Sequence, residues 1–257
     1  MKQSEGNRFQ EFFIDDKYIF LKNYLYNYLL RKYAIEKIMW KEKVDIILEV
    51  GSGISPIITT EGHIVYSDLS FLALQTLKKN LGKGMFVVAD GMKLPFRSDS
   101  FSHVISSEVL EHLEDDRKAL GEIARVIKPS GAFIVTFPHR RFYYTSDDRF
   151  VKHFRRYELA EMEDHLKNVG LSPVLVRKVL GPLEKITMCM AIFVFSIVQR
   201  FHKSNGRNVK LLRQMVIFSF LFKWINRLYA GLAWLDARIM PRALSTVLLI
   251  KAVKKNK

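Results

Sequence analysis

Acidic side chains end three successive apolar runs of this chain, and a glycine turn follows the first of them. Glu49 stands just before the turn that contains Gly51 and Gly53. Asp68 lies 15 residues beyond Gly53, and Asp90 ends the next run. Glycines let the backbone turn tightly and approach a ligand closely. A carboxylate at the second run can accept two hydrogen bonds from a ribose diol, and one at the third can accept from an adenine amino group.

Each acid also has an ordinary structural explanation as a helix cap or a turn former. Three of them at consecutive strand ends beside a glycine turn are hard to explain by capping alone, so the pattern favours a ligand. That ligand is not expected to carry a pyrophosphate. A dinucleotide fingerprint needs a third glycine where the chain has Pro56, and no Gly-Lys-Ser/Thr loop is present. A nicotinamide-dependent oxidoreductase is therefore disfavoured.

An alternation of predicted strands and helices positions these acids. Strands are expected at 44–50, 63–68, 85–90, 103–107, 132–137, 173–180 and 246–253. Helices are expected at 11–43, 69–81, 115–127 and 158–169, with a very short one between the glycine turn and the second strand. This alternation predicts an α/β fold with a parallel, doubly wound sheet. Ligands of such sheets bind at the carboxyl ends of the strands, where the three acids fall.

Five stretches of the chain occur in the order and spacing of a known family. They are ILEVGSG (47–53), YSDLS (66–70), ADGMKLPFRSDSFSHVISSEVLEHL (89–113), ALGEIARVIKPSGAFIVTFP (119–138) and HFRRYELAEMEDHLKNVGL (153–171). With them the chain resembles the class I S-adenosylmethionine (SAM)-dependent methyltransferases, in the broad group of quinone-biosynthesis and type 11 methyltransferases. The resemblance implies a Rossmann-like, seven-stranded methyltransferase sheet with SAM as the cofactor.

The resemblance also implies which residues bind SAM. They lie at the ends of the first four strands: Glu49, Gly51, Gly53, Asp68, Leu69, Asp90, Gly91, Met92 and Ser106. The first three would line the methionine end of SAM, Asp68 would hold the ribose hydroxyls, and Asp90 would fix the adenine. Ser106 and Ser107 would pass near the sulfonium. SAM carries two cationic groups and no phosphate, which suits a site rich in carboxylates.

Methyl transfer is an in-line displacement at a carbon that the sulfonium activates, so the protein mainly positions the partners and excludes water. A general base is needed only when the acceptor must lose a proton. The candidates are His112, His139, His153 and Tyr157. We select His112 because it follows Glu108 by four residues, in the segment that the resemblance places at the acceptor pocket. We interpret His153 as a polar surface or packing residue. No metal site is assigned, and the single cysteine excludes a cysteine cluster.

The positive charge of the chain is concentrated in its last third. Residues 177–257 contain 16 Lys and Arg against 2 Asp and Glu, which makes +14 of the total +15. Because the same segment is strongly apolar, this pairing indicates an anionic membrane surface more than nucleic acid. The alternative is a solvated basic face that covers extra core helices.

These observations divide the sequence into four segments. They are an N-terminal helical cover (1–43), a SAM-binding core (44–180), an apolar basic insertion (181–245), and the last strand with a basic tail (246–257). The 14 uncharged residues 186–199 are fewer than the about 20 that span a bilayer. Over 209–240, the cations at 213, 223, 227 and 238 share an arc of about 80°. Apolar residues lie largely opposite: Phe218, Phe222, Ile225, Tyr229 and Leu232. This pattern is typical of an interfacial helix, though extra core helices or a dimer interface would also produce it.

We therefore expect a SAM-dependent methyltransferase that acts on a small-molecule or lipid-like acceptor. It would be cytoplasmic, with 181–245 at an anionic membrane surface. One alternative is a catalytically silent protein of the same fold that binds a membrane or a partner. Another is an RNA methyltransferase, which the basic C-terminus suggests. Nucleic acid is not the expected partner, because aromatic and basic residues do not interleave outside the apolar helices.

Overall fold

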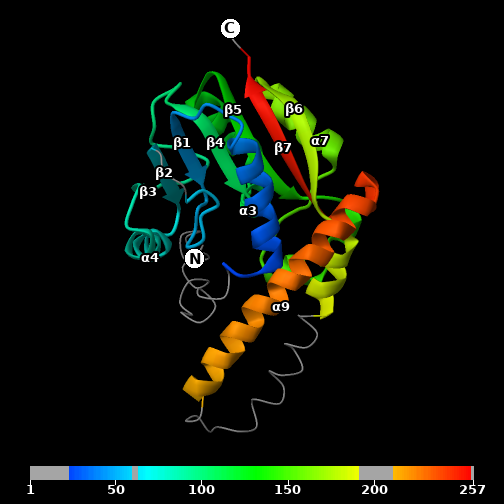
Figure 1. The fold of residues 1–257 in the computed structure, drawn as a ribbon. Helices are drawn as coiled ribbons and strands as arrows, with labels where there is room; N and C mark the ends of the chain where they lie inside the picture. The colour runs from blue at the N-terminus through cyan, green and yellow to red at the C-terminus, as the bar shows by residue number, and fades with distance from the viewer. Residues whose placement is uncertain (1–22, 60–62, 191–210, 256–257) are drawn as a thin grey trace, which may run out of the picture.

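A single seven-stranded sheet forms the centre of the molecule (Figure 1). The computed structural model describes residues 23–59, 63–190 and 211–255, with the backbone alone for 211–220. The strand order is β3-β2-β1-β4-β5-β7-β6. The strands are β1 (Ile46–Val50), β2 (His63–Asp68), β3 (Met85–Val88), β4 (Phe101–Ser107), β5 (Ile127–Pro138), β6 (Leu171–Leu180) and β7 (Val247–Lys254).

The sheet is mixed, whereas the alternation of elements predicted a parallel one. β1 to β5 pair in parallel, but β7 lies between β5 and β6 and runs antiparallel to both. The 181–245 segment separates β6 from β7 in the chain, and it returns the chain to the end of the sheet where β6 finished. β7 therefore enters the sheet from the opposite end to the first five strands. The predicted Rossmann-like sheet of seven strands is confirmed.

Helices cover both faces of the sheet. They are α3 (Tyr26–Met39), α4 (Phe71–Leu81), α5 (Asp116–Val126), α6 (Ser146–Phe150), α7 (Leu159–Asn168) and α9 (Leu211–Ile239). Short 3-10 turns occur at η2 (Leu110–His112), η3 (Arg141–Tyr143) and η4 (Arg242–Leu244). Helices α5 and α7 contribute to one buried apolar cluster, and α3, α4 and α9 contribute to the cluster on the other face.

Local chemistry explains where the core helices begin and end. Ser70 caps α4 by accepting a hydrogen bond from Ala73 N, and Gly82 ends it in the left-handed conformation. Asp115 caps α5 by accepting from Lys118 N at 2.9 Å. β5 begins at Ile127 rather than at 132, because Ile127 is buried and pairs with Phe101 of β4.

Two predicted helices differ from the structure, and the helices of the insertion are described in part. Within 11–43 the described helix is α3, and residues 11–22 lie outside the described part of the chain. Residues 54–59 form turns and bends instead of a very short helix. Residues 182–190 and α9 are helical as expected of the insertion, whereas 191–210 are not described.

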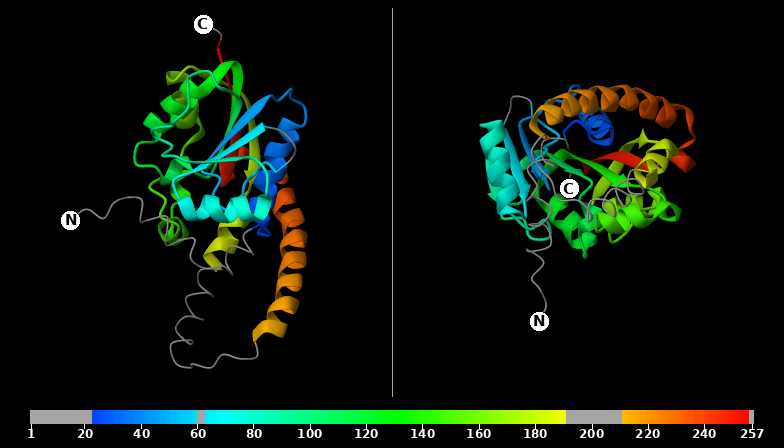
Figure 2. Two further views of the ribbon diagram at one scale, coloured as in Figure 1. Left: turned by 90° about the vertical axis from the view of Figure 1, so that its left-hand side faces the viewer. Right: turned by 90° about the horizontal axis from the view of Figure 1, so that it is seen from below.

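Helix α9 extends well beyond the sheet. It packs against α3 and β6, and its Asn226 side chain accepts a hydrogen bond from Tyr26 N at 3.2 Å. Its N-terminal half continues past the carboxyl ends of β1 and β4, away from the core (Figures 1 and 2). Of the helices in the described ranges, none is both long and apolar enough to cross a membrane.

Candidate functional site

The parallel strands bring the predicted acids to one edge of the sheet. In β1, Val50 pairs with Ser67 of β2 and with Ser106 of β4, so these three strands end at the same level. Asp68, at the end of β2, pairs with Val88 of β3, and Asp90 follows two residues later. The carboxyl ends of four neighbouring strands therefore form one continuous rim.

Asp68 holds the glycine turn against the start of α4. Its Oδ2 accepts a hydrogen bond from Gly53 N at 2.8 Å, and its Oδ1 accepts from Ser70 N at 2.8 Å. Gly51 N and Ser52 N both donate to Ser67 O, at 2.8 and 3.1 Å. The turn is therefore fixed to β2 by backbone and side-chain hydrogen bonds before any ligand binds.

Glu49 is buried, and its carboxylate closes the loop that follows the glycine turn. Its two oxygens accept hydrogen bonds from Ile57 N at 2.7 Å and Ile58 N at 3.2 Å. Burial raises the pKa of Glu49 to about 7, although these two hydrogen bonds favour the charged form. In this structure Glu49 shapes the loop at the predicted methionine end, and its oxygens are directed at the loop backbone.

Asp90 forms a turn that presents the next part of the rim. Its Oδ1 accepts a hydrogen bond from Met92 N at 2.8 Å, and its backbone oxygen accepts from Lys93 N at 2.9 Å. Gly91 lies in this turn beside Val50 and Leu113. Leu69 projects into solvent next to Asp68, with 40% of its surface exposed. The predicted ribose and adenine residues therefore occupy adjoining turns.

Buried hydroxyls lie at the same rim. Ser106 is fully buried at the end of β4, and Ser52 is buried in the glycine turn. Among the residues that the structure describes, neither Oγ finds a hydrogen-bond partner. Buried polar atoms normally have partners, so these hydroxyls are consistent with a polar ligand at the rim.

The chain is strained where it leaves β4. Glu108 has φ 56°, in the left-handed region, and its backbone N donates to Thr136 O at 3.1 Å. Its side chain forms an ion pair with Arg31 of α3 at 3.5 Å. Such strain in a residue other than glycine often occurs at functional sites. Val109 then packs against Gly51, so β4's exit loop contacts the glycine turn directly.

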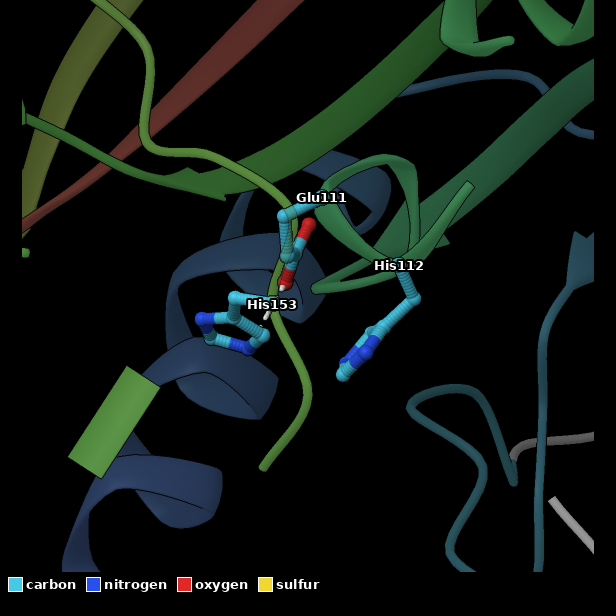
Figure 3. Close-up of side chains that lie close together, drawn as sticks. All are labelled: Glu111, His112 and His153. Atoms are coloured by element: carbon cyan, nitrogen blue, oxygen red, sulfur yellow. Dashed lines mark ion pairs between the residues drawn. The ribbon is translucent and has the colours of Figure 1, made fainter. Parts of the chain in front are cut away.

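Two histidines and a carboxylate meet beyond this loop (Figure 3). Glu111 and His112 lie in η2, and His153 reaches them from the segment that follows α6. His153 Nε2 is 3.8 Å from Glu111 Oε1, and the two imidazole rings have centroids 4.6 Å apart. Burial, reinforced by the charge of Glu108, raises the pKa of Glu111 well above its ordinary value.

The other candidate bases have structural partners. His139 is buried, and its Nδ1 lies 2.9 Å from Ser245 O, just before β7. Burial lowers the pKa of His139. Tyr157 donates its hydroxyl hydrogen to Asp116 at 2.6 Å in the core, and burial raises its pKa. Of the four candidate bases, the structure brings together His112 and His153.

Comparison with known proteins gives the class of the core. A family model described as "Methyltransferase domain" matches residues 48–135. A demethylmenaquinone methyltransferase from Clavibacter sepedonicus is 30% identical over 105 residues, which cover 40% of this chain and 43% of that relative. The chain thus matches less than half the length of the curated relatives of this name.

Solved structures share the fold at low sequence identity. A SAM-dependent methyltransferase from Thermotoga maritima is 14% identical with a TM-score of 0.60, covering 97% of this chain and 98% of that one. Phosphoethanolamine N-methyltransferase 2 from Haemonchus contortus, solved with SAM, is 18% identical with a TM-score of 0.57, covering 88% and 52%. The core of this chain therefore has the fold of class I SAM-dependent methyltransferases, and its residues 48–135 match the family model described as "Methyltransferase domain".

The rim fits the cofactor of this class. SAM presents an ammonium, a sulfonium, a ribose diol and an adenine. The rim offers two half-buried carboxylates, Asp68 and Asp90, and the buried hydroxyls of Ser52 and Ser106. A carboxylate has about four acceptor positions, so an acid that holds a backbone N–H can still accept from a ligand.

Sequence reasoning missed part of the site. The sequence does not predict a role for Arg31, which pairs with Glu108, or for Glu111, which lies between Glu108 and His112. Asp148, which holds His153 Nδ1 at 3.0 Å, was also missed. The pattern Glu-x-x-Glu-His at 108–112 was an available signal, because it concentrates titratable groups just after a strand end.

Proposed function

We propose that this chain transfers a methyl group from SAM to a lipid-like acceptor at the surface of an anionic membrane. The rim of β1 to β4 supports the cofactor half of this proposal. The observation that carries the acceptor half is an exposed apolar face on α9, the helix that extends past the carboxyl ends of the strands (Figure 1).

This face of α9 consists of large apolar side chains at helical spacing, each between 46% and 70% exposed. They are Leu221, Trp224, Ile225, Leu228, Leu232, Leu235 and Ile239. At 100° per residue they occupy an arc of about 100°. A contiguous apolar face of this kind indicates an interaction site rather than ordinary surface.

Basic residues flank the apolar face of α9. Arg227 and Arg238 are exposed beside it, and the Arg238 guanidinium lies 5.2 Å from the centre of the Trp234 ring. Arginine and tryptophan side chains suit the interface between lipid headgroups and acyl chains. The net charge of +14 in residues 177–257 complements anionic lipid.

The exposed apolar face of α9 differs in part from the apolar face that the sequence predicts for 209–240. Ile225 and Leu232 are exposed on it, as expected for lipid contact. Phe222 and Tyr229 are half-buried, on the side of α9 that faces the core, and Asn226 and Ala233 are buried there. The side chain of Phe218 lies outside the described residues.

The position of the apolar face of α9 relative to the rim suggests the chemical class of the methyl acceptor. A membrane-bound face near the carboxyl ends of the strands would bring the rim close to molecules dissolved in the bilayer. Relatives are named demethylmenaquinone methyltransferase and ubiquinone/menaquinone biosynthesis C-methyltransferase. We therefore propose a prenylated quinone or a similar ring with an apolar tail as the acceptor, methylated at carbon.

The test uses vesicles of phosphatidylglycerol and phosphatidylethanolamine with a demethylated menaquinone dissolved in them and kept reduced to the quinol, whose ring carbon can attack the methyl group. The purified chain and labelled SAM should yield S-adenosylhomocysteine and a quinone heavier by one methylene. The variant Leu228→Gln/Leu232→Gln should bind these vesicles at least about tenfold more weakly, while S-adenosylhomocysteine binding in calorimetry is unchanged.

The matched control is Val174→Gln, which changes an apolar residue on β6 that is 58% exposed, as Leu232 is. It should bind vesicles as the unaltered chain does. Unchanged vesicle binding by the α9 variant would overturn the membrane part of the proposal. Absence of S-adenosylhomocysteine binding would overturn the methyltransferase part, and binding without turnover would favour a silent binding module.

A further inference from the structure

The cluster of Glu111, His112 and His153 has the composition of a metal site. Each residue offers one ligand atom, and these three atoms all lie within 4.8 Å of one another (Figure 3). The residues come from two segments separated by about 40 positions, which the fold brings together beside the exit of β4. Two imidazoles with one carboxylate are a common ligand set for divalent transition metals.

The buried carboxylate of Glu111 is the first feature that indicates a bound cation. Its side chain is fully buried, and neither carboxylate oxygen finds a hydrogen-bond partner among the described residues. Its contact with His153 Nε2 at 3.8 Å is too long for a hydrogen bond. A buried carboxyl without hydrogen bonds is costly, and a bound cation would remove that cost.

The orientation of the His153 ring is the second feature that indicates a bound cation. Its Nδ1 lies 3.0 Å from Asp148 Oδ1, which leaves Nε2 directed toward Glu111. Histidines that bind metals usually donate their second ring N–H to a carboxylate in this way. Asp148 is itself held by Arg156 at 2.8 Å and by Lys185 at 2.7 Å, so its position is rigid.

Cations near the cluster already have anionic partners. Lys185 contacts both Asp147 and Asp148 at 2.7 Å, and Arg156 pairs with Asp148. Their charge is therefore largely compensated outside the cluster, and Glu111 is left as the carboxylate that a metal ion would contact.

We propose that Glu111, His112 and His153 bind one divalent transition-metal ion of the zinc type, with Asp148 as the residue that positions His153. Ligand bonds of about 2.1 Å in a tetrahedral site place ligand atoms about 3.4 Å apart. The three ligand atoms of this cluster are at most 4.8 Å apart, so side-chain rotations that move them by about 1 Å complete the site. Three protein ligands leave a fourth position open.

The fourth, open position of this metal site bears on the methyl acceptor, an inference that rests on the proposed function. Glu111 and His112 follow Ser106 and Ser107 within six residues, so the ion would lie near the methyl-transfer site. An open position on such an ion can hold an acceptor oxygen. The site therefore points to an acceptor that carries an oxygen next to the methylated position.

The experiment uses the full chain without a histidine tag, freed of metal by chelation. Equilibrium dialysis against Zn²⁺ with metal analysis should show one ion per chain, and Co²⁺ should give the visible absorption of a tetrahedral site. Glu111→Gln and His153→Ala should each weaken binding at least about tenfold. Asp148→Asn keeps all three ligands and should weaken binding by about 10-fold to 100-fold.

The control variant is His165→Ala, which removes a half-buried histidine of α7 outside the cluster and should leave metal affinity unchanged. Circular dichroism and S-adenosylhomocysteine calorimetry establish that each variant is folded. No stoichiometric ion in the unaltered chain would overturn the metal site, as would unchanged affinity in Glu111→Gln. If S-adenosylhomocysteine still binds in that case, the methyltransferase proposal stands without the metal.

Discussion

Gly51 is a residue of the site that leaves no room for a side chain. Its φ is 70°, and an added Cβ would lie 2.4 Å from Val109 Cγ2. Both the backbone conformation and the space available therefore require glycine here. The contact also joins the glycine turn to the loop after β4, so a substitution would disturb two parts of the rim together.

We expect Gly51→Ala to lower the unfolding free energy by at least about 2 kcal/mol, because overpacking adds to the cost of the left-handed conformation. Gly82→Ala is the matched control, since Gly82 has φ 68° with nothing within 4 Å of an added Cβ. It should cost about 1 kcal/mol. Urea unfolding measures both, and equal losses would contradict the role of Val109.

Glu49 makes stability depend on pH. Its pKa is about 7 in the folded protein against an ordinary 4.5, so the folded chain binds this proton more tightly than the unfolded chain. The contribution of Glu49 to the unfolding free energy therefore falls as the pH rises from 4.5 to 7, by about 3 kcal/mol in all.

Urea unfolding of the unaltered chain and of Glu49→Gln at several pH values checks this prediction. The difference between the two chains isolates Glu49 from other titrating groups. We expect the unaltered chain to lose stability relative to the variant between about pH 4.5 and pH 7. A constant difference across that range would show that burial does not raise the pKa of Glu49.

At the residue scale, the sequence predicted the rim but not the histidine cluster. Glu49 and Asp68 lie at the ends of strands and Asp90 just after one, these strands are recognisable locally, and the parallel arrangement brings their ends together. His153 lies 41 residues after His112 in a segment without regular periodicity. Its position depends on how α6 and the following loop pack, which spacing alone does not predict.

At the scale of elements, Lys185 links the helical residues 182–190 to α6. Its Nζ contacts the carboxylates of Asp147 and Asp148, and all three side chains are buried. Removing one partner of a buried ion pair leaves the other charge uncompensated. Lys185 is therefore expected to determine how the insertion begins after β6.

We expect Lys185→Met to destabilise the chain by about 3 to 5 kcal/mol in thermal or urea unfolding. Lys167→Met is the matched control. Lys167 pairs with Asp164 at 3.6 Å, but both side chains are mostly exposed. That pair should contribute less than about 1 kcal/mol. Similar losses in the two variants would show that the buried contacts of Lys185 add nothing.

The sequence predicted where the helices begin better than it predicted which side of each helix faces the core. Caps at Ser70 and Asp115 explain why the core helices begin near the predicted residues. On α9, the spacing of the cations predicts a polar face that puts Phe222 and Tyr229 on the lipid side. The side facing the core is instead defined by the small or polar residues Asn226 and Ala233, which allow close packing.

At the scale of the whole molecule, the uneven charge predicts how salt affects membrane binding. The last third carries +14, and the rest of the chain is nearly neutral. Raising salt from about 0.1 M to 1 M shortens the screening length from about 10 to 3 Å. Binding to anionic vesicles should weaken strongly, while the apolar face retains part of it.

Sedimentation with phosphatidylglycerol vesicles at the two salt concentrations measures this effect, and neutral phosphatidylcholine vesicles provide the control. Binding to neutral vesicles should change little with salt. Salt-independent binding to both would show that charge does not contribute. Salt-sensitive binding of RNA that exceeds vesicle binding would favour a nucleic-acid partner instead.

The place of β7 has a consequence for how the protein is made. β7 is the last of the seven strands of this sheet in chain order, yet it fills the gap between β5 and β6. Until residues 247–254 emerge, β5 and β6 lack the strand that pairs with both of them, and the whole of 181–245 is synthesised in that interval. A stalled nascent chain would thus display two open backbone edges, which we expect chaperones to recognise.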